Sequence, residues 1–146
     1  MQKKESNERD ERDARQSRKG SGSDLGRAAN ESDLAVRTKS FALQIIRLFS
    51  ALPKTTEAQV VGKQVLRSGT SVGANYREAY RARSRAEFIS KCGDSLRELE
   101  ETAYWLELLL DGKIVASEKL SNLRQECGEL IAIFVTILKR SKEGPS

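Results

Sequence analysis

The chain has 146 residues, of which 26 are Lys or Arg and 21 are Asp or Glu, and it contains no histidine. This length suits one domain with a hydrophobic core. The lack of histidine removes the usual general base near neutral pH, and two cysteines are too few for a disulfide framework or a four-thiolate zinc site. We therefore expect no enzyme activity, no cofactor and no metal site.

The N-terminal segment 1–33 differs in composition from the rest of the chain. It has equal numbers of basic and acidic side chains and almost no large apolar residue. Such a segment buries too little surface to offset its ordering entropy, which predicts a disordered, solvated tail. An auxiliary nucleic-acid contact is the alternative, but zero net charge argues against it. No signal peptide or membrane span is apparent, so we expect a cytoplasmic protein with reduced thiols.

Four helices are predicted between residues 34 and 141, and residues 142–146 are expected to be flexible. The first helix runs from about Ser32 to Leu52, because apolar residues recur every three or four positions until Pro53. The fourth helix begins near Ser117 and has the same helical spacing of apolar residues.

Capping signals delimit the two middle helices. The second helix is predicted to open at Thr56, which can form a capping box with Gln59. Ser84 and Glu87 offer the same arrangement at the start of the third helix. Gly112 is expected to end the third helix as a left-handed residue.

The third helix has a sustained heptad pattern of apolar residues. Its predicted seam comprises Ile89, Cys92, Leu96, Leu99, Ala103, Leu106 and Leu110. Such helices with short connections favour antiparallel neighbours, which predicts an all-α, up-down-up-down four-helix bundle. Cys92 and Cys127 lie at heights that differ by about 14 Å in this arrangement. We therefore expect both cysteines to pack as small hydrophobic residues without a disulfide.

A run of small residues, Ser68–Ala74, interrupts the apolar pattern of the second helix. Its two glycines each cost about 1 kcal/mol relative to alanine in a helix interior. We interpret the run as a face that closely approaches another helix. A phosphate-binding loop is the alternative, but no strand precedes the run and the Lys-Ser/Thr ending of a P-loop is missing.

The basic surplus is concentrated between residues 63 and 91, where only Glu78 and Glu87 oppose it. Arginine dominates this stretch, and guanidinium groups suit bidentate phosphate recognition. We predict nucleic-acid binding, with structured RNA as the expected ligand. The predicted binding residues are Lys63, Arg67, Arg77, Arg81, Arg83, Arg85 and Lys91.

Other interpretations of these charges stay open. The basic residues can form an ordinary solvated face, or a scaffold surface that meets acidic proteins, including Glu98 and Glu101 of a neighbouring copy. Glu78 is expected to pair with Arg77 or Arg81. Tyr76 and Tyr80 interleave with the arginines and can stack on bases, although tyrosine on a core seam is commoner.

The fourth helix has more apolar surface than one seam requires, and an ordinary surface helix has an apolar stripe of only ~100°. Either this helix is unusually buried or its spare apolar face meets another subunit, and we predict the second, self-association. The expected interface residues are Ile131, Ile133, Val135 and Leu138.

The motif Gln64–Asn75, followed by Glu78 and then Arg83–Phe88, resembles that of small bacterial four-helix-bundle proteins. These proteins were first noted as products of intervening sequences in large-subunit ribosomal RNA genes, and they include the accessory variability protein of diversity-generating retroelements. The resemblance covers about residues 34–140 and implies a homopentamer. From the retroelement members it also implies nucleic acid and a reverse transcriptase as partners. Ala79, where members commonly have glycine, and the charged tail depart from the family pattern.

Overall fold

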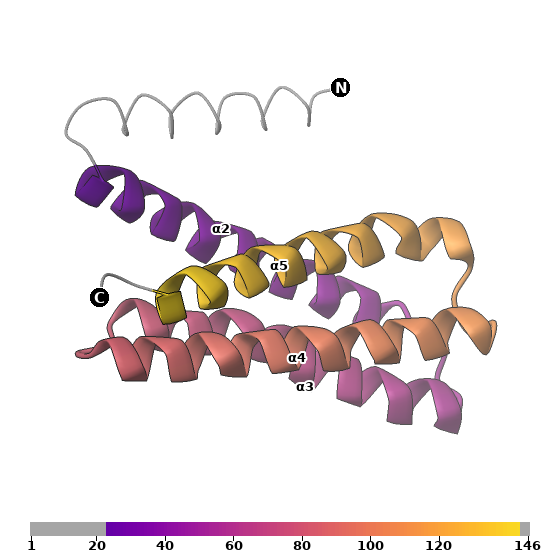
Figure 1. Cartoon of the computed structure of the whole chain (residues 1–146). Coiled ribbons are helices and arrows are strands. Elements are labelled where there is room, and N and C mark those ends of the chain that lie inside the picture. Colours follow the sequence, from indigo (N-terminus) through magenta and orange to yellow (C-terminus); the bar gives the residue numbers. More distant parts are fainter. Residues whose placement is uncertain (1–22, 144–146) are drawn as a thin grey trace. The chain divides into compact units, whose positions relative to one another are not determined.

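A computed structural model describes the backbone of residues 23–143 and the side chains from Asp33 onward (Figure 1). The helices are α2 (Ser23–Ser50), α3 (Thr56–Tyr80), α4 (Arg85–Asp111) and α5 (Ser117–Glu143). No strand occurs in the described residues, and the predicted all-α four-helix bundle is confirmed. Helix α2 begins before the predicted start near Ser32, so residues 23–33 of the predicted 1–33 tail are helical, and its residues 1–22 lie outside the described range.

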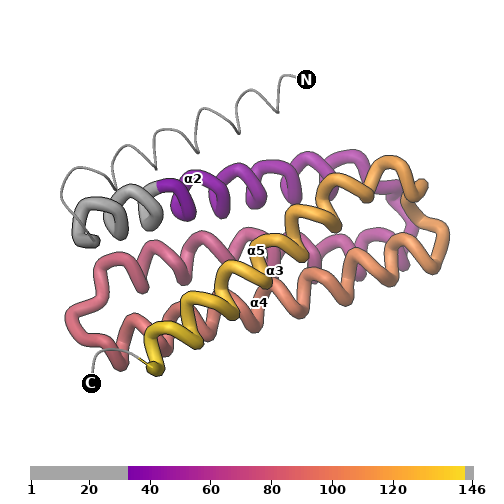
Figure 2. The backbone as a smooth tube through the Cα atoms, turned by 45° about the horizontal axis from the view of Figure 1, so that its top comes forward, coloured from indigo at the N-terminus to yellow at the C-terminus, as the bar shows by residue number. Residues whose placement is uncertain are grey.

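The chain divides into two compact units, one ending at Arg37 and one beginning at Thr38. The second unit holds the C-terminal part of α2 together with α3, α4 and α5. Helix α3 packs along α4, and α4 packs along α5. The α3–α4 connection and the C-terminal end of α5 lie at one end of this unit, and the α4–α5 connection lies at the other (Figure 1, Figure 2). The chain therefore runs up and down, as predicted. Within the described range, no helix has an apolar stretch long enough to cross a membrane.

The buried seam of α4 differs from the predicted one, because two hydroxyl residues replace predicted apolar positions. The seam comprises Cys92, Ser95, Leu99, Thr102, Leu106 and Leu109. Ser95 Oγ donates to the Val72 carbonyl oxygen at 2.8 Å, and Thr102 Oγ1 lies 2.7 Å from Ser68 Oγ. These hydrogen bonds satisfy the hydroxyls, so small polar side chains can occupy a closely packed helix interface. Leu96 and Ala103 are half-buried beside it.

The small-residue run Ser68–Ala74 lies entirely within α3, which confirms close helix packing rather than a phosphate-binding loop. A Cβ atom on Gly69 would lie 2.7 Å from Ile45 Cγ1, and one on Gly73 would lie 3.1 Å from Thr38 Oγ1. Both contacts are made with α2. The glycines therefore allow the α2 and α3 backbones to approach more closely than any larger residue would permit.

The α3 and α4 caps differ in detail from the predicted capping boxes. The N-cap of α3 is Thr55, whose hydroxyl accepts from Ala58 N at 3.3 Å, while Gln59 Nε2 donates to the Pro53 carbonyl oxygen. Thr56 is therefore the first helical residue.

At α4, Ser84 Oγ accepts from Glu87 N at 3.0 Å, as predicted. The returning hydrogen bond comes from Arg83 N, which donates to Glu87 Oε1 at 3.1 Å, rather than from Ser84 N. The first turn of α4 and the connection before it are thus tied together by one carboxylate.

The left-handed residue after α4 is Lys113, with φ of 59°, and not Gly112, which has φ of −79°. Lys113 N donates to the Leu110 oxygen and Ile114 N to the Leu109 oxygen, both at 3.0 Å. This pair of bonds is a Schellman motif. Gly112 is still required for space, because a Cβ atom there would lie 2.9 Å from the Leu108 carbonyl oxygen.

Both cysteines are buried free thiols, which confirms the prediction that they do not form a disulfide. Cys127 Sγ donates to the Leu99 carbonyl oxygen at 3.4 Å. Burial raises the pKa of Cys127 to about 12, because a thiolate would lose its hydration there. Cys127 therefore packs as an apolar residue at neutral pH.

We expect Gly69→Ala to lower the free energy of unfolding by about 1–3 kcal/mol, because its methyl group would overlap Ile45. The matched control is Gly93→Ala in α4, where no atom lies within 4 Å of an added Cβ. This control is expected to gain up to about 1 kcal/mol from helix propensity. Urea unfolding followed by circular dichroism measures both changes. A Gly69→Ala variant as stable as wild type would contradict the close α2–α3 contact.

We expect Lys113→Gly to raise the free energy of unfolding by about 0.5–1 kcal/mol. A residue with a side chain costs about 1–2 kcal/mol in the left-handed conformation of Lys113, and glycine removes this cost. Glycine also gives the unfolded chain more conformational freedom, which offsets part of the gain. Gly112→Ala should instead destabilise the protein through its contact with the Leu108 oxygen. If Gly112→Ala unfolded at a higher urea concentration than Lys113→Gly, the helix would not end in the Schellman motif described here.

Candidate nucleic-acid interface

Four arginines surround the point where α3 ends and α4 begins. Arg77 lies in the last turn of α3, Arg81 is its C-cap, Arg83 lies in the connection and Arg85 is the first residue of α4. All four are exposed. Among the described residues, none of their side chains forms an ion pair. We call these four residues the basic corner.

The sharp turn between the two helices is what gathers the basic corner. The N–H groups of Arg81 and Ala82 donate to the oxygens of Glu78 and Ala79, which closes the last turn of α3. Ser84 then adopts an extended conformation and caps α4. Because α4 starts only a few residues after α3 ends, arginines from two helices project at one end of the bundle.

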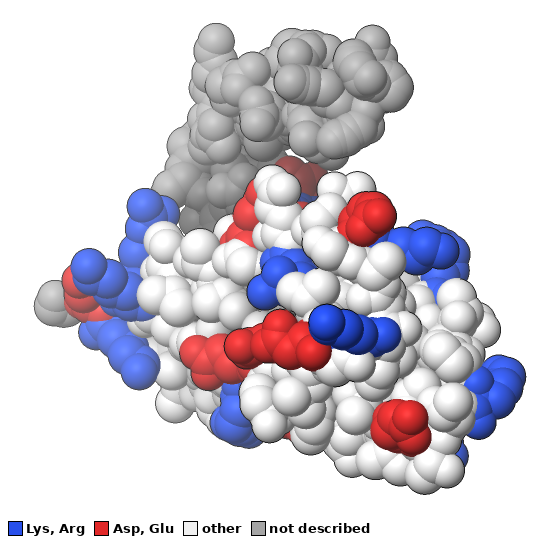
Figure 3. All heavy atoms as spheres, turned by 90° about the vertical axis from the view of Figure 1, so that its right-hand side faces the viewer, with Lys and Arg blue, Asp and Glu red and all other residues white. Residues whose placement is uncertain are grey.

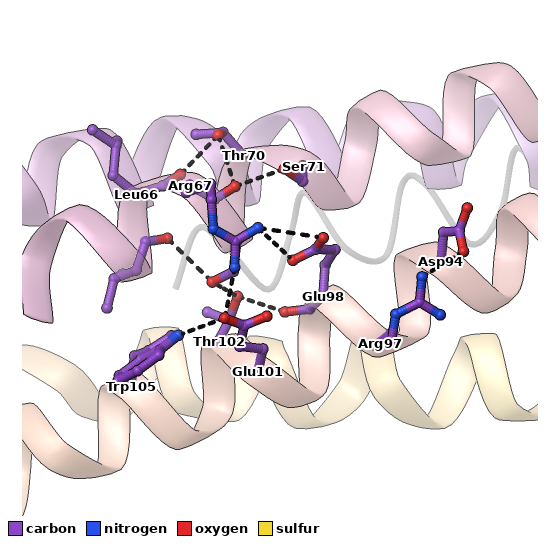
Figure 4. A network of polar contacts seen from close by, with 12 residues as sticks. Leu66, Arg67, Thr70, Ser71, Asp94, Arg97, Glu98, Glu101, Thr102 and Trp105 are labelled. Atoms are coloured by element: carbon purple, nitrogen blue, oxygen red, sulfur yellow. Dashed lines mark hydrogen bonds and ion pairs between the residues drawn. The ribbon is translucent and has the colours of Figure 1, made fainter.

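Arg67 lies midway along α3 and is paired within its own chain (Figure 4). Its Nη1 lies 3.2 Å from Glu98 Oε1 and its Nη2 lies 2.6 Å from Glu101 Oε2. Trp105 Nε1 donates to the same Glu101 oxygen at 3.1 Å. The hydrogen bond with Glu101 raises the pKa of Arg67 and lowers the pKa of Glu101. Contrary to the prediction, Arg67 is not a free phosphate ligand, and these two glutamates already have a partner.

Lys91 is also neutralised within the chain, because its Nζ lies 2.7 Å from Glu78 Oε1. The hydrogen bond with Glu78 raises the pKa of Lys91. The expected pairing of Glu78 with Arg77 or Arg81 is therefore wrong, and these two arginines have no acidic partner among the described residues.

Lys63 is exposed but lies far from the basic corner. Fourteen residues of α3 separate it from Arg77, which corresponds to about 21 Å along the helix. The seven predicted binding residues therefore do not form one surface, and only the four arginines of the basic corner lie together uncompensated.

Three basic residues at the end of α5 were not among the predicted binding residues: Lys139, Arg140 and Lys142. The antiparallel course of α5 brings its C-terminal end to the same end of the bundle as the basic corner (Figure 1, Figure 2). Residues 77–91 and 139–143 together contain eight basic and three acidic side chains. The predicted up-and-down topology already implies this position, because it places the end of the fourth helix beside the connection between the second and third helices.

The opposite end of the bundle has a different charge distribution. Figure 3 views the face that includes the α4–α5 connection, and there Lys and Arg are interspersed with Asp and Glu.

Among the described residues, no group of three or more Cys, Asp or Glu side chains could hold a metal ion.

The predicted interface residues of α5 fall on two sides of the helix. Its buried seam contains Leu130 and Phe134. Ile131 and Leu138 are half-buried and Val135 is 47% exposed, and helical spacing places these three on one flank of that seam. Ile133 is half-buried and lies on the other flank.

A model of the 23S rRNA-intervening sequence protein family matches residues 30–136. A crystal structure of a protein of unknown function from the S23 ribosomal protein family of Bacteroides thetaiotaomicron is 37% identical, with a TM-score of 0.71. The match covers 75% of this chain and 98% of that one. None of the curated proteins matches the chain significantly. Because the family match includes the basic corner and most of the bundle, the chain belongs to the 23S rRNA-intervening sequence protein family.

Proposed function

We propose that this protein is a non-enzymatic nucleic-acid-binding protein whose basic corner contacts phosphate groups. The observation that carries the proposal is the set of four exposed arginines that no carboxylate of the described chain neutralises. Such groups bind phosphates in bidentate fashion, with an affinity that falls steeply as salt rises.

The position of the arginines on the helices supports this function. The N-terminus of a helix carries partial positive charge, so Arg83 and Arg85 add to the field of α4 instead of opposing it. The Glu87 carboxylate in the first turn offsets part of this positive field, and a bound anion would offset the remainder. Lys139, Arg140 and Lys142 raise the positive potential at the same end.

Structured RNA is the ligand that we propose. The family name connects such proteins with 23S rRNA, and arginines that contact phosphates bind with little sequence preference. The scaffold alternative is less well supported, because Glu98 and Glu101, its expected acceptors on a neighbouring copy, already bind Arg67.

We also propose that the protein self-associates through the flank of α5 formed by Ile131, Val135 and Leu138. Nearly half of the surface of Val135 is exposed, and its neighbours one turn before and after it are aliphatic. A second copy covering this flank would bury that apolar surface. Each copy in a ring would then add another basic corner, which strengthens binding to a long polyanion.

The triple variant Arg77→Glu, Arg81→Glu, Arg85→Glu is expected to abolish RNA binding in anisotropy titrations with a folded RNA. For wild type we expect the logarithm of the affinity to fall with the logarithm of salt concentration with a slope of about −3, from four phosphate contacts.

The matched control is Lys54→Glu, Lys119→Glu, Arg124→Glu, which changes net charge equally on exposed residues outside the basic corner. It should keep binding within a few-fold, because its charges lie more than a Debye length (about 10 Å) from the basic corner. Equal loss of binding in both variants would mean that only the net charge matters.

We expect Val135→Glu to shift the assembly toward the monomer, because a carboxylate would be buried in the interface. Light scattering coupled to size exclusion measures the mass, which for wild type should be a multiple of 16.3 kDa. Val60→Glu is the control, since Val60 is 59% exposed on α3. A monomeric wild type, or equal dissociation by both variants, would contradict the α5 interface.

A further inference from the structure

Two tyrosines, Tyr76 and Tyr80, lie one helical turn apart at the end of α3, and they have opposite environments. Tyr76 is 1% exposed and belongs to the core, whereas Tyr80 is 47% exposed. Arg77 lies three residues before Tyr80 and Arg81 directly follows it, while Glu78 between them is paired with Lys91. An exposed aromatic ring therefore lies within the basic corner.

The ring of Tyr80 is supported from the core. Its centroid lies 6.3 Å from that of Tyr76, and the Tyr76 ring makes an edge-to-face contact with Phe134 of α5 at 5.7 Å. The three rings form a row that leads from the bundle interior to the basic corner. A ring held in this way loses little side-chain entropy when a ligand packs on it.

Charge distinguishes Tyr80 from the other exposed tyrosine. Tyr104 on α4 is 52% exposed and packs beside Trp105 at 5.1 Å, but its neighbours along the helix include Glu100, Glu101 and Glu107. A polyanion would be repelled from such a surface. Only at Tyr80 do the described residues combine an exposed tyrosine with uncompensated arginines.

We propose that Tyr80 is a stacking platform for an unpaired base, so that the ligand of the basic corner is a single-stranded segment or loop of nucleic acid. This inference rests on the proposed function and narrows its ligand class. Aromatic rings beside cationic grooves are the means by which proteins hold unpaired bases. In a continuous duplex the base faces are already stacked, and only phosphates would meet the arginines.

The test uses the full chain and three probes: a fluorescein-labelled single-stranded RNA of about 12 nucleotides, the same strand in a duplex, and an abasic strand of equal length. Tyr80→Leu keeps an apolar contact with Tyr76 but removes the π face. It should weaken single-strand binding by about 5- to 150-fold, which corresponds to the loss of one base stack. Duplex and abasic-strand binding should change by less than about twofold, because neither offers a free base.

Matched variants separate stacking from other roles of Tyr80. Tyr80→Phe and Tyr80→Trp should retain single-strand binding, and Tyr104→Leu should leave every probe unaffected. Thermal unfolding by circular dichroism and the light-scattering mass should be the same for Tyr80→Leu as for wild type. A change in mass with no selective loss of single-strand binding would assign Tyr80 to contact between copies and overturn the proposal.

The two proposals fail in different ways. If wild type binds all three probes, the arginine triple variant binds none, and Tyr80→Leu behaves as wild type, then stacking is wrong while the proposed function stands. If wild type binds no probe in moderate salt, the proposed function itself is wrong. Selective loss of single-strand binding in Tyr80→Leu and its retention in Tyr80→Phe would establish the stacking role.

Discussion

Close contact between helix backbones is the constraint on which the rest of this structure depends. Helix α3 presents glycines to α2 and Ser68 to α4, and Gly69 leaves no room for a methyl group beside Ile45. On its other side, Ser68 and Thr102 are hydrogen-bonded at 2.7 Å. Van der Waals contact and satisfied hydroxyls thus hold α3 in one position between two neighbours. That position determines where α3 ends and therefore where the basic corner lies.

The same arrangement explains which charges are neutralised and which remain free. A cation midway along a helix lies within reach of the neighbouring helix, as Arg67 lies within reach of Glu98 and Glu101. At a helix end no neighbouring helix continues beside the side chain. Arg81 and Arg83 accordingly project from the α3–α4 turn without an acidic partner in the described residues.

Charge and aromatic surface have complementary roles at the proposed site. Arginines that contact phosphates supply affinity and depend on salt, but they distinguish poorly between duplex and single strand. Tyr80 is supported by the core through Tyr76 and adds a surface that only an unpaired base can use. The core of the bundle and the proposed ligand site are therefore connected through one aromatic row.

The sequence by itself determined the four helices, their order and most apolar seams, because apolar periodicity and helix-stop residues are local signals. It also located the basic stretch and the tight glycine face. Only the tertiary structure decided that Ser95 and Thr102 belong to the core, since each hydroxyl has a hydrogen-bond partner on α3, the Val72 oxygen for Ser95 and Ser68 Oγ for Thr102. It likewise decided that Arg67 is paired while Arg77 is not, because an ion pair across helices depends on which side chains lie at the same height, and periodicity within one helix does not contain that information.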